Sequence, residues 1–168
     1  MSKSDWTRAG LTRAGFVGWL RWSSCPAGLS LIDRQSGGVY IVYRAGRLGP
    51  KYQDRSPAGR FRGDPSVTRE ALQANWVPGA RVIYIGKGNH GRLRKRLEEF
   101  VLFGRGGDKR HWGGRLIWQL DQSERLLVAW KTLPTETDPP AVEKAMIAAF
   151  RNDYGKPPFA NDPDRLGR

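Results

Sequence analysis

Cysteine and histidine are scarce in this chain of 168 residues, and long apolar runs are missing. Cys25 is the only cysteine, so an intrachain disulfide is impossible and a reducing compartment fits. His90 and His111 are the only histidines, and with Cys25 they show no zinc-like spacing. No segment has the length and apolarity of a signal peptide or a membrane span. These absences predict a cytoplasmic protein with no membrane partner.

Acidic residues are also few: 16 Asp and Glu stand against 29 Lys and Arg, which gives a net charge of +13. The excess is uneven, because residues 81–115 hold ten basic and three acidic residues, and residues 44–70 hold seven and three. Residues 121–168 are nearly neutral, with seven and eight. A surplus of positive charge concentrated in two segments predicts a polyanionic partner.

The length predicts one domain with its own hydrophobic core, spanning residues 1–168. Hydrophobic residues make up 39% of the chain, which excludes global disorder. Residues 1–37 have one apolar patch, at 15–20, and are interpreted as a short helix or arm packed on the domain. Residues 45–80 are rich in Gly, Pro and Arg, so we expect a long, irregular, basic insertion that contacts the polyanion.

Apolar and β-branched patterning predicts an α+β fold. The predicted strands cover 38–44, 81–86 and 126–132, and the predicted helices cover 92–103 and 139–151. Asp138 is the expected N-cap of the last helix, and residues 112–120 fit either a strand or a helix. Because only irregular sequence separates the first two strands, we expect them to pair antiparallel in a small sheet flanked by helices.

A glycine-rich turn joins the second predicted strand to the helix that follows. Residues 86–91 match the G-x-G-x-x-G pattern of dinucleotide-binding turns, but no second βα unit with a ribose-binding acid follows. The glycines therefore favour a tight turn that a phosphate can approach. The helix then begins with the cations Arg92, Arg94, Lys95 and Arg96. Such a cluster is either the solvated face of an amphipathic helix or a grip for a phosphate.

Three further kinds of side chain allow two interpretations each. Tyr40 and Tyr84 lie in apolar strands, where a tyrosine is either a core residue or a hydroxyl displayed at a site. Glu143 flanks the apolar stripe of the last helix, either as a partner of the helix dipole or as a ligand of a divalent metal ion. Either His90 or His111 can move a proton near the arginine-rich helix.

Four motifs in order carry a resemblance to a known family. They are Gly38-Val39-Tyr40, Tyr84-Ile85-Gly86-Lys87-Gly88, Leu93-x-x-Arg96-Leu97 with the later Glu143, and Pro158-Phe159-Ala160-Asn161. Over residues 38–161 the chain resembles the GIY-YIG nuclease superfamily, and its restriction-endonuclease-type or stand-alone members in particular. The resemblance implies a three-stranded antiparallel sheet flanked by helices and a single divalent metal ion. Residues 41–83 are longer than the family's usual hairpin between the first two motifs, hence the expected insertion.

The resemblance also implies catalytic roles. Tyr40 and Tyr84 would contact the nucleophilic water or help to remove its proton. Arg96 would stabilise charge on the phosphate, and Glu143 would hold the metal ion, Mg²⁺ or Mn²⁺. Arg94 fits one common spacing of the catalytic arginine, whereas the Leu-x-x-Arg-Leu frame selects Arg96.

A histidine and several cations complete the expected site. Some restriction-type members place a histidine one turn after the arginine, where this chain has Phe100, and His111 is the candidate to replace it. The expected substrate-binding residues are Lys87, Arg92, Arg94, Lys95 and Asn161. We therefore predict a metal-dependent endonuclease that hydrolyses phosphodiester bonds, with double-stranded DNA as its partner. The alternatives are a nucleic-acid-binding module without turnover and an RNA-directed nuclease or toxin with the same site.

Overall fold

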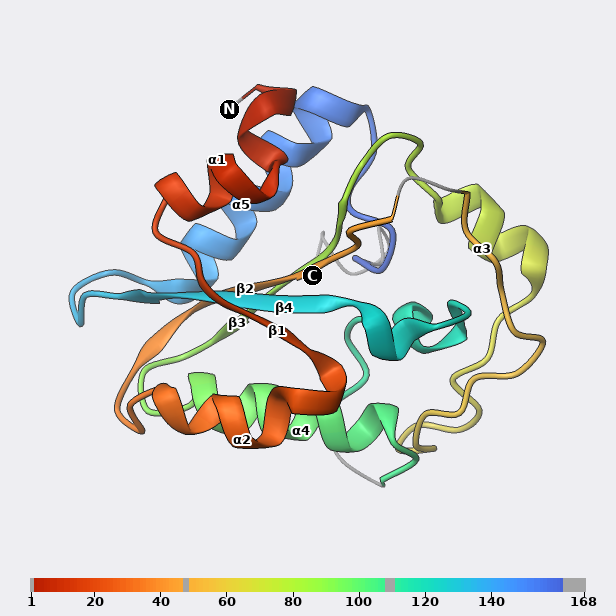
Figure 1. Ribbon diagram of the computed structural model, residues 1–168, viewed down its shortest axis with the longest axis horizontal. Helices are drawn as coiled ribbons and strands as arrows, with labels where there is room; N and C mark the ends of the chain where they lie inside the picture. The colour runs from red at the N-terminus through yellow and green to blue at the C-terminus, as the bar shows by residue number, and fades with distance from the viewer. Residues whose placement is uncertain (1, 47–48, 108–110, 162–168) are drawn as a thin grey trace.

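A four-stranded antiparallel sheet organises the residues that this computed structural model describes, which are 2–46, 49–107 and 111–161. The strands are β1 (Val17–Arg21), β2 (Gly37–Tyr43), β3 (Val82–Gly88) and β4 (Leu127–Leu133). Their order across the sheet is β1-β4-β2-β3, so β1 and β3 are the edge strands (Figure 1). The predicted α+β class and the antiparallel pairing of the first two predicted strands, now β2 and β3, are confirmed.

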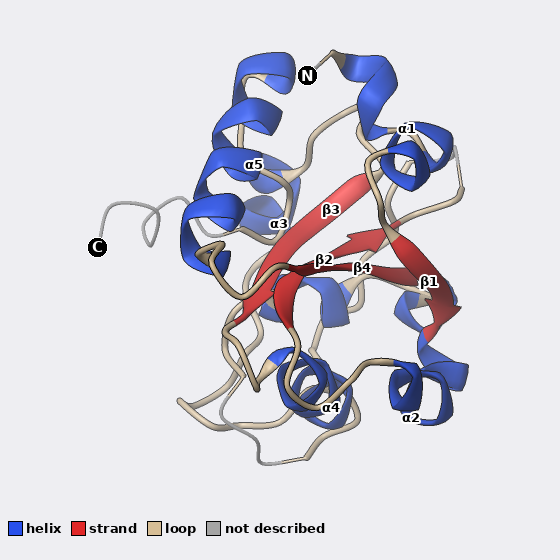
Figure 2. Ribbon diagram, turned by 90° about the vertical axis from the view of Figure 1, so that its left-hand side faces the viewer, coloured by secondary structure: helices blue, strands red, loops and turns tan. Residues whose placement is uncertain are grey.

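Helices cover both faces of this sheet. They are α1 (Arg8–Arg13), α2 (Cys25–Gly28), α3 (Arg69–Asn75), α4 (Leu93–Gly104) and α5 (Pro139–Tyr154), with short 3₁₀ turns at Lys3–Trp6, Trp22–Ser24, Leu29–Leu31, Arg115–Gln119 and Ser123–Arg125. Figure 2 shows α1 and α5 on one face, and α2 and α4 on the other. No described helix combines the length and the apolar character that crossing a membrane requires.

Alternation along β2 divides the apolar residues between two cores. Tyr40 and Val42 point into the core on the side of α4, whereas Val39, Ile41 and Tyr43 point into the core on the side of α5. All seven residues of β2 are buried, because the strand lies inside the sheet with helices on both faces. Tyr40 therefore lies on an interior strand, directly beside the edge strand β3.

The sheet has one strand more than the three predicted. Residues 1–37, interpreted as a short helix or arm, contain the helix α1 but also a strand, because Val17–Arg21 forms β1 against β4. A β-bulge interrupts the pairing, and Gly18 and Trp19 both adopt positive φ there, which a helix does not tolerate. A Cβ atom on Gly18 would overlap the ring of Trp130, so the glycine makes room for an aromatic side chain of the neighbouring strand.

The long connection between β2 and β3, residues 44–81, is more regular than predicted. It contains α3, whose N-cap Thr68 accepts a hydrogen bond from the amide of Ala71. Trp76 packs edge-on against Phe159, with ring centroids 5.4 Å apart, and Val77 is buried in the core beside α5. Trp76 and Val77 thus anchor this segment to the body of the domain.

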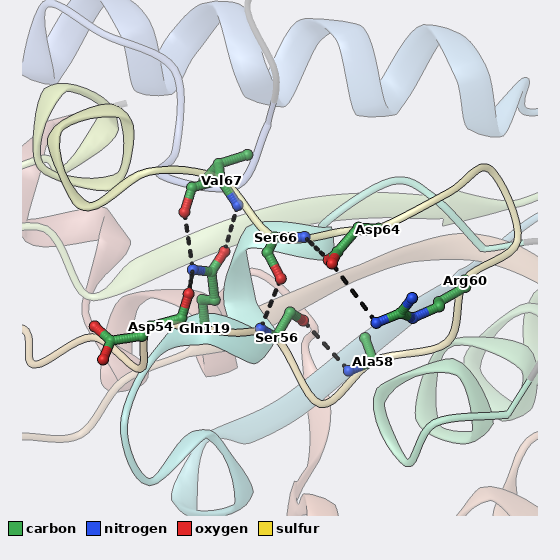
Figure 3. A network of polar contacts seen from close by, with 8 residues as sticks. All are labelled: Asp54, Ser56, Ala58, Arg60, Asp64, Ser66, Val67 and Gln119. Carbon is green, nitrogen blue, oxygen red and sulfur yellow. Dashed lines mark hydrogen bonds and ion pairs between the residues drawn. The ribbon is translucent and has the colours of Figure 1, made fainter.

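A buried amide fixes the outer part of this connection. Gln119 is 1% exposed, and its Oε1 accepts a hydrogen bond of 2.8 Å from the amide of Val67. Its Nε2 donates to the carbonyl oxygens of Val67, Gln53 and Asp54 at 3.0, 3.2 and 3.5 Å (Figure 3). Because one side chain serves both arms of the loop, and Tyr52 forms an isolated β-bridge with Leu120, the described part of the connection is held as a defined structure.

Candidate active site

A cavity of about 340 Å³ gathers most of the predicted site residues at the β3 edge of the sheet. Its lining is Tyr40, Tyr84, Lys87, Gly88, Asn89, Arg92, Arg96 and Glu143. These residues come from β2, β3, the turn after β3, α4 and α5, so α4 on one face and α5 on the other both reach around the same strand. The structure thus brings together six of the residues singled out in the sequence, with Gly88 and Asn89 added.

The Tyr40 side chain can reach this cavity because the residue beside it on β3 is Gly86. The two residues are paired across β2 and β3, and a Cβ atom on Gly86 would lie 2.5 Å from Cζ and 2.6 Å from the hydroxyl of Tyr40. Any other residue would therefore collide with the phenol. Glycine at this position lets a tyrosine on an interior strand pass over the edge strand and reach the cavity.

An aromatic layer supports both tyrosines from behind. The rings of Tyr40 and Tyr84 have centroids 5.9 Å apart, and both contact Phe100 of α4. Phe100 stacks on His111 with a centroid distance of 4.4 Å and an interplanar angle of 23°. A Cβ atom on Gly113 would lie 2.8 Å from the Tyr84 hydroxyl, so the 111–114 loop packs directly against that tyrosine.

His111 lies below Tyr40, outside the cavity lining. Its Nε2 is 3.5 Å from the Tyr40 hydroxyl, a long hydrogen bond whose direction depends on the tautomer of the ring. Burial, reinforced by the guanidinium charge of Arg96, holds the pKa of His111 well below its usual range. The ring is therefore neutral at physiological pH, and in the tautomer with the proton on Nδ1 its Nε2 accepts the hydrogen bond from the Tyr40 hydroxyl.

Tyr40 is itself a poor base. Burial raises the pKa of Tyr40 well above its usual range, and the neighbouring Tyr84 adds to the rise while the charge of Arg96 opposes it. The phenol is protonated at physiological pH, with His111 as the acceptor within reach of its hydroxyl. An unaided phenolate at Tyr40 is not available.

One carboxylate binds both cavity arginines, Arg92 at the N-cap of α4 and Arg96 in its first turn. Glu99 contacts Arg96 at 3.3 Å and Arg92 at 3.6 Å, and its side chain is 18% exposed. Residues 92, 96 and 99 share one helical face, since they are spaced by four and three positions. Glu99 was missed in the sequence, although this spacing from two arginines was a usable signal.

The cations of α4 divide between two faces of the helix. Arg92 and Arg96 line the cavity, whereas Arg94 and Lys95 line a different pocket together with Arg34. The Nε of Arg94 donates to Glu98 at 2.9 Å. Of the two arginines that the sequence left open, Arg96 is the one placed at the tyrosines.

Glu143 reaches the cavity from the second turn of α5. Asp138 is the N-cap, as predicted, and accepts a hydrogen bond of 3.2 Å from the amide of Ala141. Burial raises the pKa of Glu143 to about 7, against the opposing charges of Lys87 and Arg96. A carboxylate so poorly solvated gains from a cation bound beside it.

His90 joins the two segments that lead into α4 and α5. Its Nε2 lies 2.9 Å from the carbonyl oxygen of Thr137, to which it can only donate a hydrogen bond. A Cβ atom on Gly37 would collide with its ring, which places the imidazole against the start of β2. Of the two histidines, His90 holds the loops together and His111 lies at a tyrosine.

Asn161 lies on the outer edge of β3 and does not line the cavity. Its amide exchanges two hydrogen bonds with the backbone of Ile85, accepting at 2.9 Å and donating at 2.8 Å. The amide of Ala160 donates to Ile83 in the same way. The predicted contact of Asn161 with substrate is therefore replaced by a contact that caps the free edge of the strand carrying Tyr84.

A divalent ion of the magnesium type suits the donors at this cavity. Glu143 is the one carboxylate of the lining among the described residues, and no three His, Cys, Asp or Glu side chains gather anywhere in the described ranges. Mg²⁺ commonly keeps several waters and takes one or two carboxylates together with substrate phosphates. The high pKa of Glu143 adds a second indication, because the lining leaves this carboxylate incompletely neutralised.

Comparisons with known proteins gave no further identification: no family model, no curated protein and no solved structure matched this chain.

Proposed function

We propose that this protein is a metal-dependent endonuclease of the GIY-YIG type that hydrolyses phosphodiester bonds in DNA. The observation that carries the proposal is the convergence of Tyr40, Arg96 and Glu143 on one cavity from three separate elements. These are the residues that the family resemblance selects by motif. Sequence positions more than forty residues apart have no reason to meet at one solvent-accessible cavity if each is only a core or surface residue.

The cavity offers the groups that phosphodiester hydrolysis needs. Arg96, held by Glu99, donates to a phosphate oxygen and stabilises the charge that develops during attack. Lys87 and Arg92 add positive charge on the same lining. The hydroxyls of Tyr40 and Tyr84 orient the attacking water against the phosphorus.

Tyr40 and His111 orient the attacking water. The Tyr40 oxygen accepts a hydrogen bond from the water, and in the tautomer with its proton on Nδ1 the His111 ring accepts a hydrogen bond from the Tyr40 hydroxyl at Nε2. Because the low pKa of His111 disfavours its cationic form, the ring stays neutral and the proton of the water passes to bulk solvent. His111 thus fills the role that a histidine on α4 would have, with Phe100 in the helical position stacking on its ring.

Glu143 is the residue that would hold the metal ion. The bound ion would supply charge neutralisation at the phosphate and at the leaving oxygen. Lys87 and Arg96 lie close enough to Glu143 to lower its pKa, so the carboxylate, the cations and the phosphate form one electrostatic unit. His90 keeps α5 in place relative to the turn before α4.

A panel of substrates tests this proposal. The purified protein is incubated with supercoiled plasmid, linear duplex DNA, single-stranded DNA and structured RNA, with Mg²⁺, Mn²⁺ or EDTA. We expect metal-dependent nicking or linearisation of plasmid, with termini that can be mapped. Cleavage of RNA alone would favour the RNA-directed alternative. Binding without any cleavage under all metals would contradict the proposed hydrolysis and favour a binding module.

A further inference from the structure

A second basic pocket lies on the other face of α4, next to the cavity. It is lined by Arg34, Gly91, Arg94, Lys95 and Glu98. We call it the flanking pocket. Its cations belong to segments far apart in the sequence, since Arg34 precedes β2 whereas Arg94 and Lys95 lie in the first turn of α4.

Backbone hydrogen bonds fix Arg34 at this place. The amide of Gly91 donates to the carbonyl oxygen of Gln35 at 2.8 Å, and the amide of Leu93 donates to that of Ser36 at 3.3 Å. The turn itself is closed by Asp33, whose side chain accepts a hydrogen bond of 2.7 Å from the amide of Gln35. The segment before β2 is thus attached to the turn before α4, and residues of both segments form the flanking pocket.

The flanking pocket carries a net positive charge. Glu98 neutralises Arg94 through a 2.9 Å contact at Nε, which leaves the charges of Arg34 and Lys95. Both side chains are exposed, and no ion pair of either is found within the described ranges. An exposed pair of cations without an acidic partner next to a paired arginine suits a phosphate dianion or diester.

The two pockets share one short turn. Asn89 lines the cavity and Gly91 lines the flanking pocket, and two residues span at most roughly 7 Å. The two pockets therefore adjoin across this turn, as neighbouring phosphates adjoin along one strand of a polynucleotide. A ligand with a single phosphate can occupy one pocket only, whereas a polynucleotide presents regularly spaced phosphates to both.

From this arrangement we infer that the flanking pocket binds a second backbone phosphate of the polynucleotide whose cleaved phosphate lies in the cavity. The inference rests on the proposed function for the cavity but concerns a separate set of side chains. It makes Arg34, Arg94 and Lys95 positioning residues, which hold the strand without touching the reacting phosphate. It also makes a polynucleotide, and not a mononucleotide or a small diester, the substrate class that this protein binds best.

The test compares two double variants with the same charge change. Arg34→Ala/Lys95→Ala removes the exposed cations of the flanking pocket. Arg13→Ala/Arg151→Ala removes two exposed cations from α1 and α5, on the opposite face of the sheet (Figure 2). Affinity for a fluorescent duplex of about 20 base pairs is measured by anisotropy in EDTA over a series of salt concentrations. Hydrolysis of bis-p-nitrophenyl phosphate, a diester with one phosphorus, is measured with Mg²⁺.

For the flanking-pocket variant we expect a dissociation constant at least about fivefold higher and a salt slope reduced by about 1–2. Hydrolysis of the small diester should stay within about twofold of the parent rate, and the α1/α5 variant should resemble the parent in both assays. Unchanged duplex affinity and slope, or an equal loss in the α1/α5 variant, would overturn the inference. If the parent protein cuts nothing in the substrate panel, the proposed endonuclease fails, yet the salt slopes in EDTA still decide on the flanking pocket.

Discussion

Two basic regions of this protein, the cavity at β3 and the connection 44–81, use their charges in opposite ways. In the connection, Arg60 lies 3.7 Å from Asp64 and Arg69 lies 2.9 Å from Asp54, on the protein surface. In the cavity, one carboxylate serves two arginines and a second carboxylate is only partly neutralised. A surplus of positive charge in a sequence therefore indicates the class of partner but does not locate the chemistry.

The largest expected difference between the two regions is the loss of catalytic rate when one arginine of each is replaced. Arg96→Gln removes the donor that faces the phosphate, so kcat for plasmid nicking should fall by about 10²–10³-fold. Arg60→Gln breaks an exposed pair with Asp64 and should leave kcat within about twofold. The measurement is single-turnover nicking at saturating protein. Equal losses in the two variants would remove the distinction between the regions.

The next largest difference is expected when one glycine of each region is replaced by alanine. Gly86→Ala places a methyl group against the Tyr40 phenol, so the ring must move, unfolding should become easier by about 1–3 kcal/mol, and nicking should be lost. Gly49→Ala in the connection meets no atom within 4 Å and should leave stability and nicking unchanged. Chemical denaturation and the nicking assay check both variants. A Gly86→Ala protein with parental activity would show that Tyr40 need not cross β3.

Removing the hydrogen bonds of Gln119 should destabilise the connection without changing catalysis in the cavity. Gln119→Leu leaves the amide of Val67 and the carbonyl oxygens of Gln53 and Asp54 without their partner, which should cost about 1–3 kcal/mol of stability. Proteolysis within 51–67 should become faster, while hydrolysis of bis-p-nitrophenyl phosphate stays near the parent rate. Gln73→Leu, on the exposed face of α3, is the control. Loss of small-diester hydrolysis in Gln119→Leu would mean that the connection shapes the cavity.

A further contrast between the two regions concerns pH, and it is seen only over a limited range. The pKa of Glu143 is raised from 4.5 to about 7, so between these values the folded protein binds more protons than the unfolded chain. Stability in EDTA should therefore fall as the pH rises through this window and level off above it. Glu143→Gln should match the parent near pH 4.5 and exceed it by about 1–3 kcal/mol at pH 8, whereas Glu70→Gln in the connection should show no such difference. Parallel pH profiles for Glu143→Gln and the parent would contradict the burial of this carboxylate.

Much of the fold was predictable from local patterns. β-Branched runs located β2, β3 and β4 within about two residues, and Asp138 marked the start of α5. The strand β1 was missed because its Gly18-Trp19 pair interrupts the strand pattern, and the need for a glycine comes from the Trp130 ring of a strand distant in the sequence. α3 was missed because the surrounding prolines outweighed a good N-cap at Thr68.

The candidate site was likewise predictable only in part. Motifs and helical spacing selected Tyr40, Arg96 and Glu143, but nothing local could separate Arg92 from Arg94, because that depends on which face of α4 turns toward β3. Asn161 was predicted to bind substrate, but its amide hydrogen-bonds the backbone of Ile85 on the edge strand β3. Which backbone groups a strand edge leaves for a side chain to bind depends on the three-dimensional sheet and is not written in the local sequence.

The most direct test of the account is single-turnover cleavage of supercoiled plasmid by the parent protein, Glu143→Gln and Glu136→Gln, with Mg²⁺ and with EDTA. The account predicts Mg²⁺-dependent cleavage by the parent and by Glu136→Gln, an exposed acid outside the cavity lining, and at least about 10³-fold slower cleavage by Glu143→Gln. Salt-dependent duplex binding should be retained in all three proteins. Cleavage by Glu143→Gln at the parental rate would contradict the central claim that this cavity holds the metal ion and cuts the phosphodiester.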